Sequence, residues 1–137
     1  MFHVKHVRVT AAVIEQDGRY LLCRRHPRAE LAGKWEFPGG KIETGETAEE
    51  CLVREIREEL GLEVRLKCRL GTVEEATDER HLELIAFCAE IVSGTLQVLD
   101  HEEVAWVNRE NVASYDLAPA DVAIGQWVAS GTCKGTL

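Results

Sequence analysis

The chain has 137 residues, of which 45% are hydrophobic and 29% charged, and its formal net charge is −8 at pH 7. This length suits one domain with a sizeable core, so we expect a single domain over residues 1–137. The acidic balance argues against a nucleic-acid polymer or an anionic membrane as partner, and it favours a small ligand that brings its own cation.

Five cysteines are spread along the chain, and no two of them form a CxxC pair. A zinc ribbon and a thioredoxin motif are therefore excluded. No long apolar run opens the chain, and no stretch approaches the length that crosses a membrane. We expect a cytoplasmic protein with reduced thiols, either a monomer or a homodimer.

The expected elements follow from apolar periodicity and turn residues. Strands are predicted at residues 6–14, 20–23, 35–37, 63–74, 81–92 and 103–107, and the first is a candidate for the centre of the sheet. Helices are predicted at residues 47–60, 108–115 and 120–129. The polar residues 24–34 indicate a loop over a site. Strands interrupted by a helix and followed by further helices indicate an α/β or α+β protein.

The helix at residues 47–60 has clear ends and one apolar side. Thr47 and Glu50 have the spacing of a capping box, and Gly61 is a typical helix stop. At about 100° per residue, one stripe of the helix is apolar. The stripe consists of Ala48, Leu52, Ile56 and Leu60.

Three carboxylates, those of Glu55, Glu58 and Glu59, fall within two turns of this helix. Such a cluster repels itself unless a cation lies in it. Oxygen ligands this dense select a hard divalent ion, so we expect Mg2+ or Mn2+. Mg2+ held by a few carboxylates usually binds the phosphates of a substrate. The alternative is a solvated acidic face, which is weakened because Glu59 borders the apolar stripe.

Residues 40–62 resemble the Nudix box, G-x5-E-x7-R-E-U-x-E-E-x-G-U, in which U is a bulky aliphatic residue. Its fixed positions are all occupied, by Gly40, Glu46, Arg54, Glu55, Ile56, Glu58, Glu59, Gly61 and Leu62. The preceding residues 35–43 resemble the MutT-type branch, which cleaves nucleoside triphosphates. The resemblance covers most of the chain and implies the Nudix α/β/α sandwich, with a mixed sheet between helices.

The resemblance also implies a set of metal ligands. The carbonyl of Gly39 would join the carboxylates of the box, and a further acid would come from a loop before a late tryptophan. Asp100 stands six residues before Trp106, where the MutT-type branch carries Glu, and two neighbouring glutamates, Glu102 and Glu103, are alternatives. The expected ligands are Gly39, Glu55, Glu58, Glu59 and Asp100.

Catalysis is expected from the same helix. Glu55 would take a proton from a water whose pKa the metal has lowered, and Glu58 and Arg54 complete the catalytic group. Arg54 and Arg57 have two interpretations, as partners that orient carboxylates or as ordinary surface charges. Glu46 would bind or orient a further ion. The paired glycines let the backbone approach metal or phosphate, or they form a simple tight turn.

Substrate contacts are expected outside the box. Arg25 matches an arginine that contacts the substrate phosphate in the MutT-type branch, and Lys41 matches the lysine that follows the paired glycines. Glu36 belongs to the stretch that resembles this branch, and we expect it to contact the substrate. Residues 117–121 resemble the segment that reads the base, and they also resemble the branch that acts on cytidine triphosphate.

Asp121 stands where the MutT-type branch carries an asparagine that reads the base. An ionised aspartate only accepts hydrogen bonds, which suits an exocyclic amine such as cytosine N4. A protonated aspartate can donate, so oxidised guanine stays open as a ligand. The alternative is that Asp121 merely interacts with the dipole of the helix that follows.

We therefore predict a Mg2+-dependent nucleoside triphosphate pyrophosphohydrolase that clears damaged or modified nucleotides, with a role in DNA repair. Cytidine-type and oxidised triphosphates are the expected substrates, with ADP-ribose, dinucleoside polyphosphates and sugar nucleotides as alternatives. The rival from another class is a Nudix-like module that only binds its nucleotide. The five histidines show no metal-ligand spacing and are interpreted as incidental surface or edge residues.

Overall fold

A six-stranded mixed sheet forms the middle layer of the protein. The computed structural model describes residues 4–131. The strands are β1 (Lys5–Gln16), β2 (Arg19–Arg24), β3 (Trp35–Glu36), β4 (Leu62–Ala76), β5 (Arg80–Gly94) and β6 (Glu103–Asn108). The helices are α1 (Ala48–Leu60), α2 (Arg109–Val112) and α3 (Val122–Ala129), the last preceded by a 3-10 turn at Pro119–Asp121.

The strand order is β3-β2-β1-β5-β4, with β6 paired to β2. β1 pairs in parallel with β5 and antiparallel with β2, so the prediction of a central first strand is confirmed. The β1–β2 turn has positive φ at both Asp17 (54°) and Gly18 (79°), the conformation of the tight turns that suit a twisted hairpin. The predicted strands are all present, several with longer ends.

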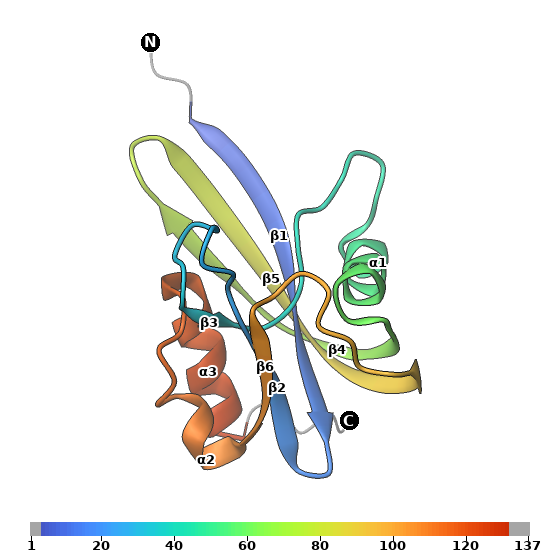
Figure 1. The fold of residues 1–137 in the computed structure, drawn as a ribbon. Helices are drawn as coiled ribbons and strands as arrows, with labels where there is room; N and C mark the ends of the chain where they lie inside the picture. Colours follow the sequence, from blue (N-terminus) through green and yellow to red (C-terminus); the bar gives the residue numbers. More distant parts are fainter. Residues whose placement is uncertain (1–3, 132–137) are drawn as a thin grey trace.

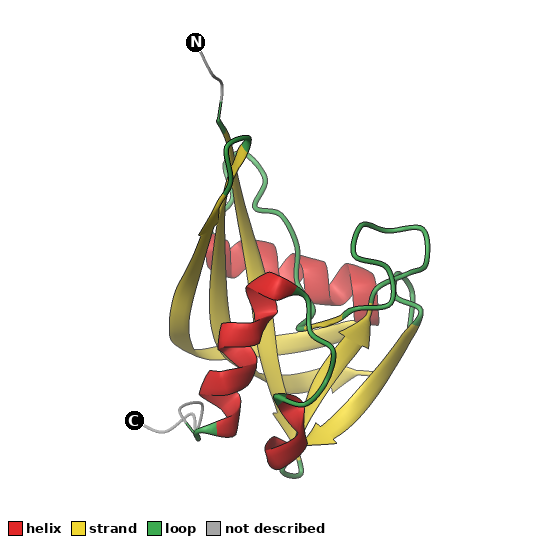
Figure 2. Ribbon diagram, turned by 90° about the vertical axis from the view of Figure 1, so that its left-hand side faces the viewer, coloured by secondary structure: helices red, strands yellow, loops and turns green. Residues whose placement is uncertain are grey.

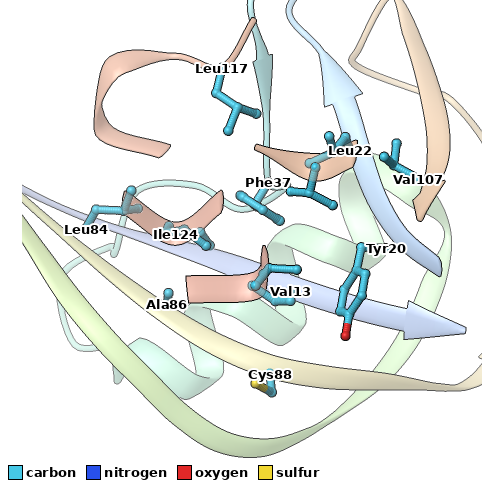
Figure 3. Close-up of a cluster of buried hydrophobic side chains, with 13 residues drawn as sticks. Val13, Tyr20, Leu22, Phe37, Leu84, Ala86, Cys88, Val107, Leu117 and Ile124 are labelled. Atoms are coloured by element: carbon cyan, nitrogen blue, oxygen red, sulfur yellow. The ribbon is translucent and has the colours of Figure 1, made fainter. Parts of the chain in front are cut away.

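Each central strand buries both faces, because successive side chains point to opposite sides of a sheet. In β1, Ala11 and Val13 pack toward α2 and α3, whereas Ala12 and Ile14 pack toward α1. Figure 3 shows the first of these cores, which gathers side chains from β2, β5, β6 and α3 around Val13. Figures 1 and 2 show the helices on the two sides of the sheet. The predicted α/β/α sandwich is confirmed.

Helix α1 has the ends and the buried side that its sequence predicts. The Thr47 hydroxyl accepts from Glu50 N at 3.0 Å, and the Glu50 carboxylate accepts from Thr47 N at 2.9 Å. Gly61 closes the helix in the left-handed conformation, with φ 69°. The apolar side is fully buried at Leu52, Ile56 and Leu60. These contacts fix the rotation of α1 and therefore the direction of its acidic side chains.

Helix α2 is shorter than the predicted helix at 108–115. It ends at Val112, after one turn. The Ser114 hydroxyl donates back to a carbonyl of the preceding turn at 2.7 Å, a local bond that competes with continued helix. The ring of Tyr115 then packs edge-on against Trp35 of β3, with 5.1 Å between ring centroids. Tertiary packing therefore ends this helix early.

The cysteines depart from the expectation of reduced thiols at one position. Cys23, Cys51 and Cys68 are free. Cys88 is buried on β5 and disulfide-bonded, so the expectation is wrong there. None of the helices formed by residues 4–131 is long and apolar enough to cross a membrane.

The capping box of α1 gives a test of the fold. Thr47→Ala removes one of its two hydrogen bonds, and we expect the free energy of unfolding in urea to fall by about 1 kcal/mol. Thr44→Ala, in the exposed turn just before the helix, is the matched control. Equal losses for the two variants would show that the cap does not stabilise α1.

Candidate active site

Arg54 organises the polar side of α1. Its Nε lies 2.6 Å from Glu46 Oε2 and its Nη2 lies 3.0 Å from Glu46 Oε1, a two-pronged ion pair. Its Nη1 lies 3.2 Å from Glu55 Oε1 and 3.1 Å from Glu58 Oε1. The hydrogen bonds from Arg54, with a smaller contribution from the Glu43 N–H, lower the pKa of Glu46 to about 2. Arg54 thus orients carboxylates, and Glu46 anchors it.

The three acids of α1 lie in different environments. The Glu58 side chain is 58% exposed, whereas that of Glu55 is 16% exposed. Burial raises the pKa of Glu55. Burial, followed by the charges of Glu55, Glu36 and Asp100, raises the pKa of Glu59 to about 9. The Oε1 atom of Glu59 is buried and has no hydrogen-bond partner among residues 4–131.

The loop before β6 brings Asp100 to these acids. The charge of Asp100 contributes to the raised pKa values of both Glu55 and Glu59, so its carboxylate lies within electrostatic reach of theirs. The other two candidates turn toward Arg24, which lies 3.0 Å from Glu103 Oε1 and 4.0 Å from Glu102 Oε2. Asp100 is therefore the loop acid that approaches α1.

The paired glycines lie in an extended segment beside β1, so their interpretation as a tight turn is wrong. Thr10 N donates to the Gly40 carbonyl at 2.8 Å, and the segment continues β3 along the free edge of β1. A Cβ on Gly39 would come within 2.0 Å of the Thr10 carbonyl oxygen. A Cβ on Gly40 would come within 1.6 Å of Glu55 Oε2. At Gly39 the backbone of β1 therefore leaves no room for a side chain, whereas at Gly40 a side chain would displace the Glu55 carboxylate.

This donor set fits a hard divalent cation. Mutually repelling carboxylates and a buried oxygen without a partner at Glu59 are what such an ion would neutralise. Glu55 and Glu59 could hold it together with the carbonyl of Gly39, whose N–H bonds to the Glu59 carboxylate, and Asp100 lies in the loop within electrostatic reach of both acids. Within residues 4–131 no three acidic, histidine or cysteine side chains form a ready-made metal cage, so the ligands would have to close around the ion. Glu58 is turned toward Arg54.

A cleft of about 800 Å³ opens beside the glycine segment. Apolar side chains of β1 and β5 form one wall, and Phe37 lies at its buried end. The polar residues that we expected to bind substrate all line this cleft: Arg25, Glu36, Lys41 and Asp121. The structure therefore brings together residues from four separate segments at a space large enough for a nucleotide.

Asp121 lies at the inner side of the cleft and is 7% exposed. Its Oδ2 accepts from Phe37 N at 2.9 Å. Although it precedes α3, its side chain makes no capping bond to that helix and accepts from Phe37 N instead. Burial raises the pKa of Asp121 to about 7, which the Phe37 N–H partly opposes. Near neutral pH this carboxyl can therefore both accept and donate hydrogen bonds.

The sequence analysis missed His101. Its side chain is only 5% exposed, and its Nε2 lies 2.9 Å from Glu36 Oε2. The other oxygen of Glu36 lies 2.7 Å from Arg25 Nη1. Burial alone would raise the pKa of Glu36, but the bonds from His101 and Arg25 lower it. The only hint in the sequence was its position directly after Asp100.

Comparison with known proteins agrees with this geometry. The family model described as NUDIX domain matches residues 4–128. CTP pyrophosphohydrolase of Escherichia coli (strain K12) is 39% identical over 121 residues, which cover 88% of this chain and 90% of that protein. Putative 8-oxo-dGTP diphosphatase 2 of Mycobacterium tuberculosis is 35% identical over 125 residues, with 88% and 84% covered.

A solved structure shows the same fold. The crystal structure of MutT protein from Methanosarcina mazei Go1 superposes with a TM-score of 0.84 and 25% sequence identity. The match covers 98% of this chain and 100% of the other chain.

The buried Glu59 predicts a pH-dependent stability. The pKa of Glu59 rises from 4.5 to about 9 on folding. Between these two pH values, Glu59 is therefore protonated in the folded state and ionised in the unfolded state. Without metal, the contribution of Glu59 to stability is therefore greatest below pH 4.5, and it is lost as pH rises through about 9. Glu59→Gln should flatten this fall and raise the free energy of unfolding at pH 8 by roughly 1–3 kcal/mol.

Thermal unfolding between pH 6 and pH 9, with and without Mg2+, checks this prediction. Mg2+ should raise the melting temperature of the wild-type protein and have little effect on Glu59→Gln. The control is Glu49→Gln, an exposed position of the same helix, which should respond to Mg2+ as the wild type does. An equal Mg2+ response in Glu59→Gln would remove Glu59 from the metal ligands.

Proposed function

Because this chain belongs to the NUDIX family, we propose that it hydrolyses nucleoside triphosphates to nucleoside monophosphate and pyrophosphate with the help of Mg2+. The observation that carries this proposal is the acidic cluster of α1, which lies against the same paired glycines that line a nucleotide-sized cleft. The paired glycines are held by hydrogen bonds to the free edge of β1. We expect free nucleotides of the cytoplasmic pool as substrates.

The reaction joins a water oxygen to an inner phosphorus, breaks the bridging P–O bond and releases pyrophosphate. When bound, Mg2+ supplies charge neutralisation for the phosphates and a lower pKa for the attacking water. Glu55 accepts the proton of that water, since its burial already raises its affinity for a proton. Arg54 holds the Glu55 carboxylate in place at 3.2 Å. Glu55 itself, Glu58, Glu59, Asp100 and the Gly39 carbonyl are the proposed metal ligands.

The cationic side chains at the cleft fit the phosphates. Arg25 is fixed from two directions, by Glu36 at 2.7 Å and by its own loop, where its Nε donates to the Glu30 carbonyl at 2.5 Å. This leaves the second amino group of its guanidinium for an anion. Lys41 lines the same cleft directly after the paired glycines. Both side chains are placed to neutralise phosphate charge near the acidic cluster.

Asp121 supports a base with an exocyclic amine. Phe37 N occupies Oδ2, so Oδ1 is the atom that we propose to face the base. In its ionised form this oxygen accepts from an amine such as cytosine N4. In its protonated form it can donate, which suits the carbonyl-rich edge of oxidised guanine. The names of the relatives, CTP pyrophosphohydrolase and putative 8-oxo-dGTP diphosphatase, correspond to these two options.

A substrate panel tests the activity. We expect Mg2+-dependent release of monophosphate and pyrophosphate from CTP, dCTP, 5-methyl-dCTP or 8-oxo-dGTP, and little from ADP-ribose or a dinucleoside polyphosphate. Glu55→Gln should lower kcat at least about 100-fold, the usual contribution of a general base, with nucleotide binding retained. Glu49→Gln is the exposed control. Binding without turnover in the wild-type protein would favour the nucleotide-binding module instead.

The base preference is predicted to depend on Asp121. Asp121→Asn should shift kcat/KM from cytosine toward oxidised guanine by about tenfold, the difference that one hydrogen bond makes. In the wild type, the cytosine preference should grow as pH rises through about 7, where Asp121 ionises. Asp116→Asn, an exposed aspartate paired with Lys34, is the matched control. An unchanged ranking of bases would remove Asp121 from base recognition.

A further inference from the structure

The loop formed by residues 95–102 lies against the active site. Its first half is tied to the end of α1, since Gln97 N donates to the Leu60 carbonyl at 2.8 Å and Leu99 N donates to the Glu59 carbonyl at 3.1 Å. In Figure 1 this orange segment passes between α1 and β6. Because Leu99 is bonded to the backbone of Glu59, the next residue, Asp100, lies near the acids of α1.

His101 is the buried member of this loop. Leu99 is 59% exposed and Asp100 and Glu102 are exposed as well, whereas the His101 side chain is 5% exposed. Its Nε2 is 2.9 Å from Glu36 Oε2, and its buried Nδ1 makes no hydrogen bond to any described residue. With Glu36 as acceptor, Nε2 carries the proton. The imidazole of His101 therefore attaches an otherwise exposed part of the loop to Glu36 of β3.

Glu36 connects His101 to the cleft. Its strand, β3, is bonded through Trp35 to residues 116 and 118, and the next residue, Phe37, donates its N–H to Asp121. The Glu36 side chain itself bridges Arg25 and His101. It lines both the main cleft and a neighbouring cavity of about 540 Å³ that also contains Asp100 and His101.

We propose that His101 is a positioning residue for metal binding: its bond to Glu36 holds the loop so that Asp100 faces Glu55 and Glu59. The inference rests on the proposed function, because the acids that it orients are the proposed metal ligands. Partners of this kind, one bond away from the ligands, commonly change metal affinity or activity by about 10–100-fold when they are removed. A purely structural role would change the melting temperature and leave metal affinity unaltered.

The test compares two substitutions of His101. His101→Leu keeps apolar bulk and removes the donor, whereas His101→Gln keeps an N–H donor near the position of Nε2. Mn2+ binding is measured by electron paramagnetic resonance without nucleotide, and kcat, KM and melting temperature are measured alongside. We expect His101→Leu to weaken Mn2+ binding and lower kcat about tenfold or more, with KM changed less, and His101→Gln to recover most of both.

A second histidine provides the matched control. His81 also pairs with a glutamate, its Nε2 being 3.1 Å from Glu74 Oε1, but it lies on β5 between Arg80 and Leu82, which both line the cleft. Alternation along the strand directs its side chain to the other face. His81→Leu should leave Mn2+ binding and kcat at wild-type values.

Two results would overturn the proposal. One is wild-type Mn2+ affinity in His101→Leu, and the other is a loss in His101→Gln as large as in His101→Leu. If His101→Leu does not fold, His101→Asn replaces it, since its shorter side chain carries the amide near Nδ1 and cannot reach Glu36. Failure of the wild-type protein to hydrolyse any triphosphate would reject the proposed function, while the Mn2+ comparison would still decide the role of His101.

Discussion

The repulsion among the carboxylates of α1 is the constraint on which the site depends. Arg54 offsets part of it by contacting Glu46, Glu55 and Glu58 at once, and it is itself anchored by Glu46 at 2.6 Å. Arg54 does not contact Glu59, which has a hydrogen bond from the Gly39 N–H but keeps one buried oxygen without a partner in the described part of the chain. A buried acid that is compensated only in part is costly, and such groups are characteristic of functional sites.

The sheet fixes the position of that acidic cluster relative to the cleft. The central strand β1 is bonded to β5 on one edge and to the glycine segment on the other, so α1, the glycines and the cleft share one rigid support. β3 then connects the two ends of the site. Its backbone binds residues 116–121, which carry Asp121, and its Glu36 side chain reaches Arg25 and His101. The segment that carries Asp121 and the loop that carries His101 are thereby connected through one short strand.

Local patterns were sufficient for much of the fold. The capping box, the glycine stop and the apolar stripe of α1 involve neighbours in the chain, and the structure confirms each of them. The predicted helix at 108–115 was wrong beyond Val112, because the packing of Tyr115 on Trp35 ends it and these two residues are far apart in the chain. The extended glycine segment was ambiguous for the same reason, since its hydrogen bonds go to β1.

The sequence by itself determined the family, the layered fold and the acidic helix, because these depend on spacing along the chain. Tertiary structure alone separated Asp100 from Glu102 and Glu103, since only the loop path decides which acid approaches α1. It also gave Asp121 a pKa of about 7, through burial that outweighs the hydrogen bond from the Phe37 N–H. His101 was missed because its partner, Glu36, is distant in the chain, and such a contact exists only after folding.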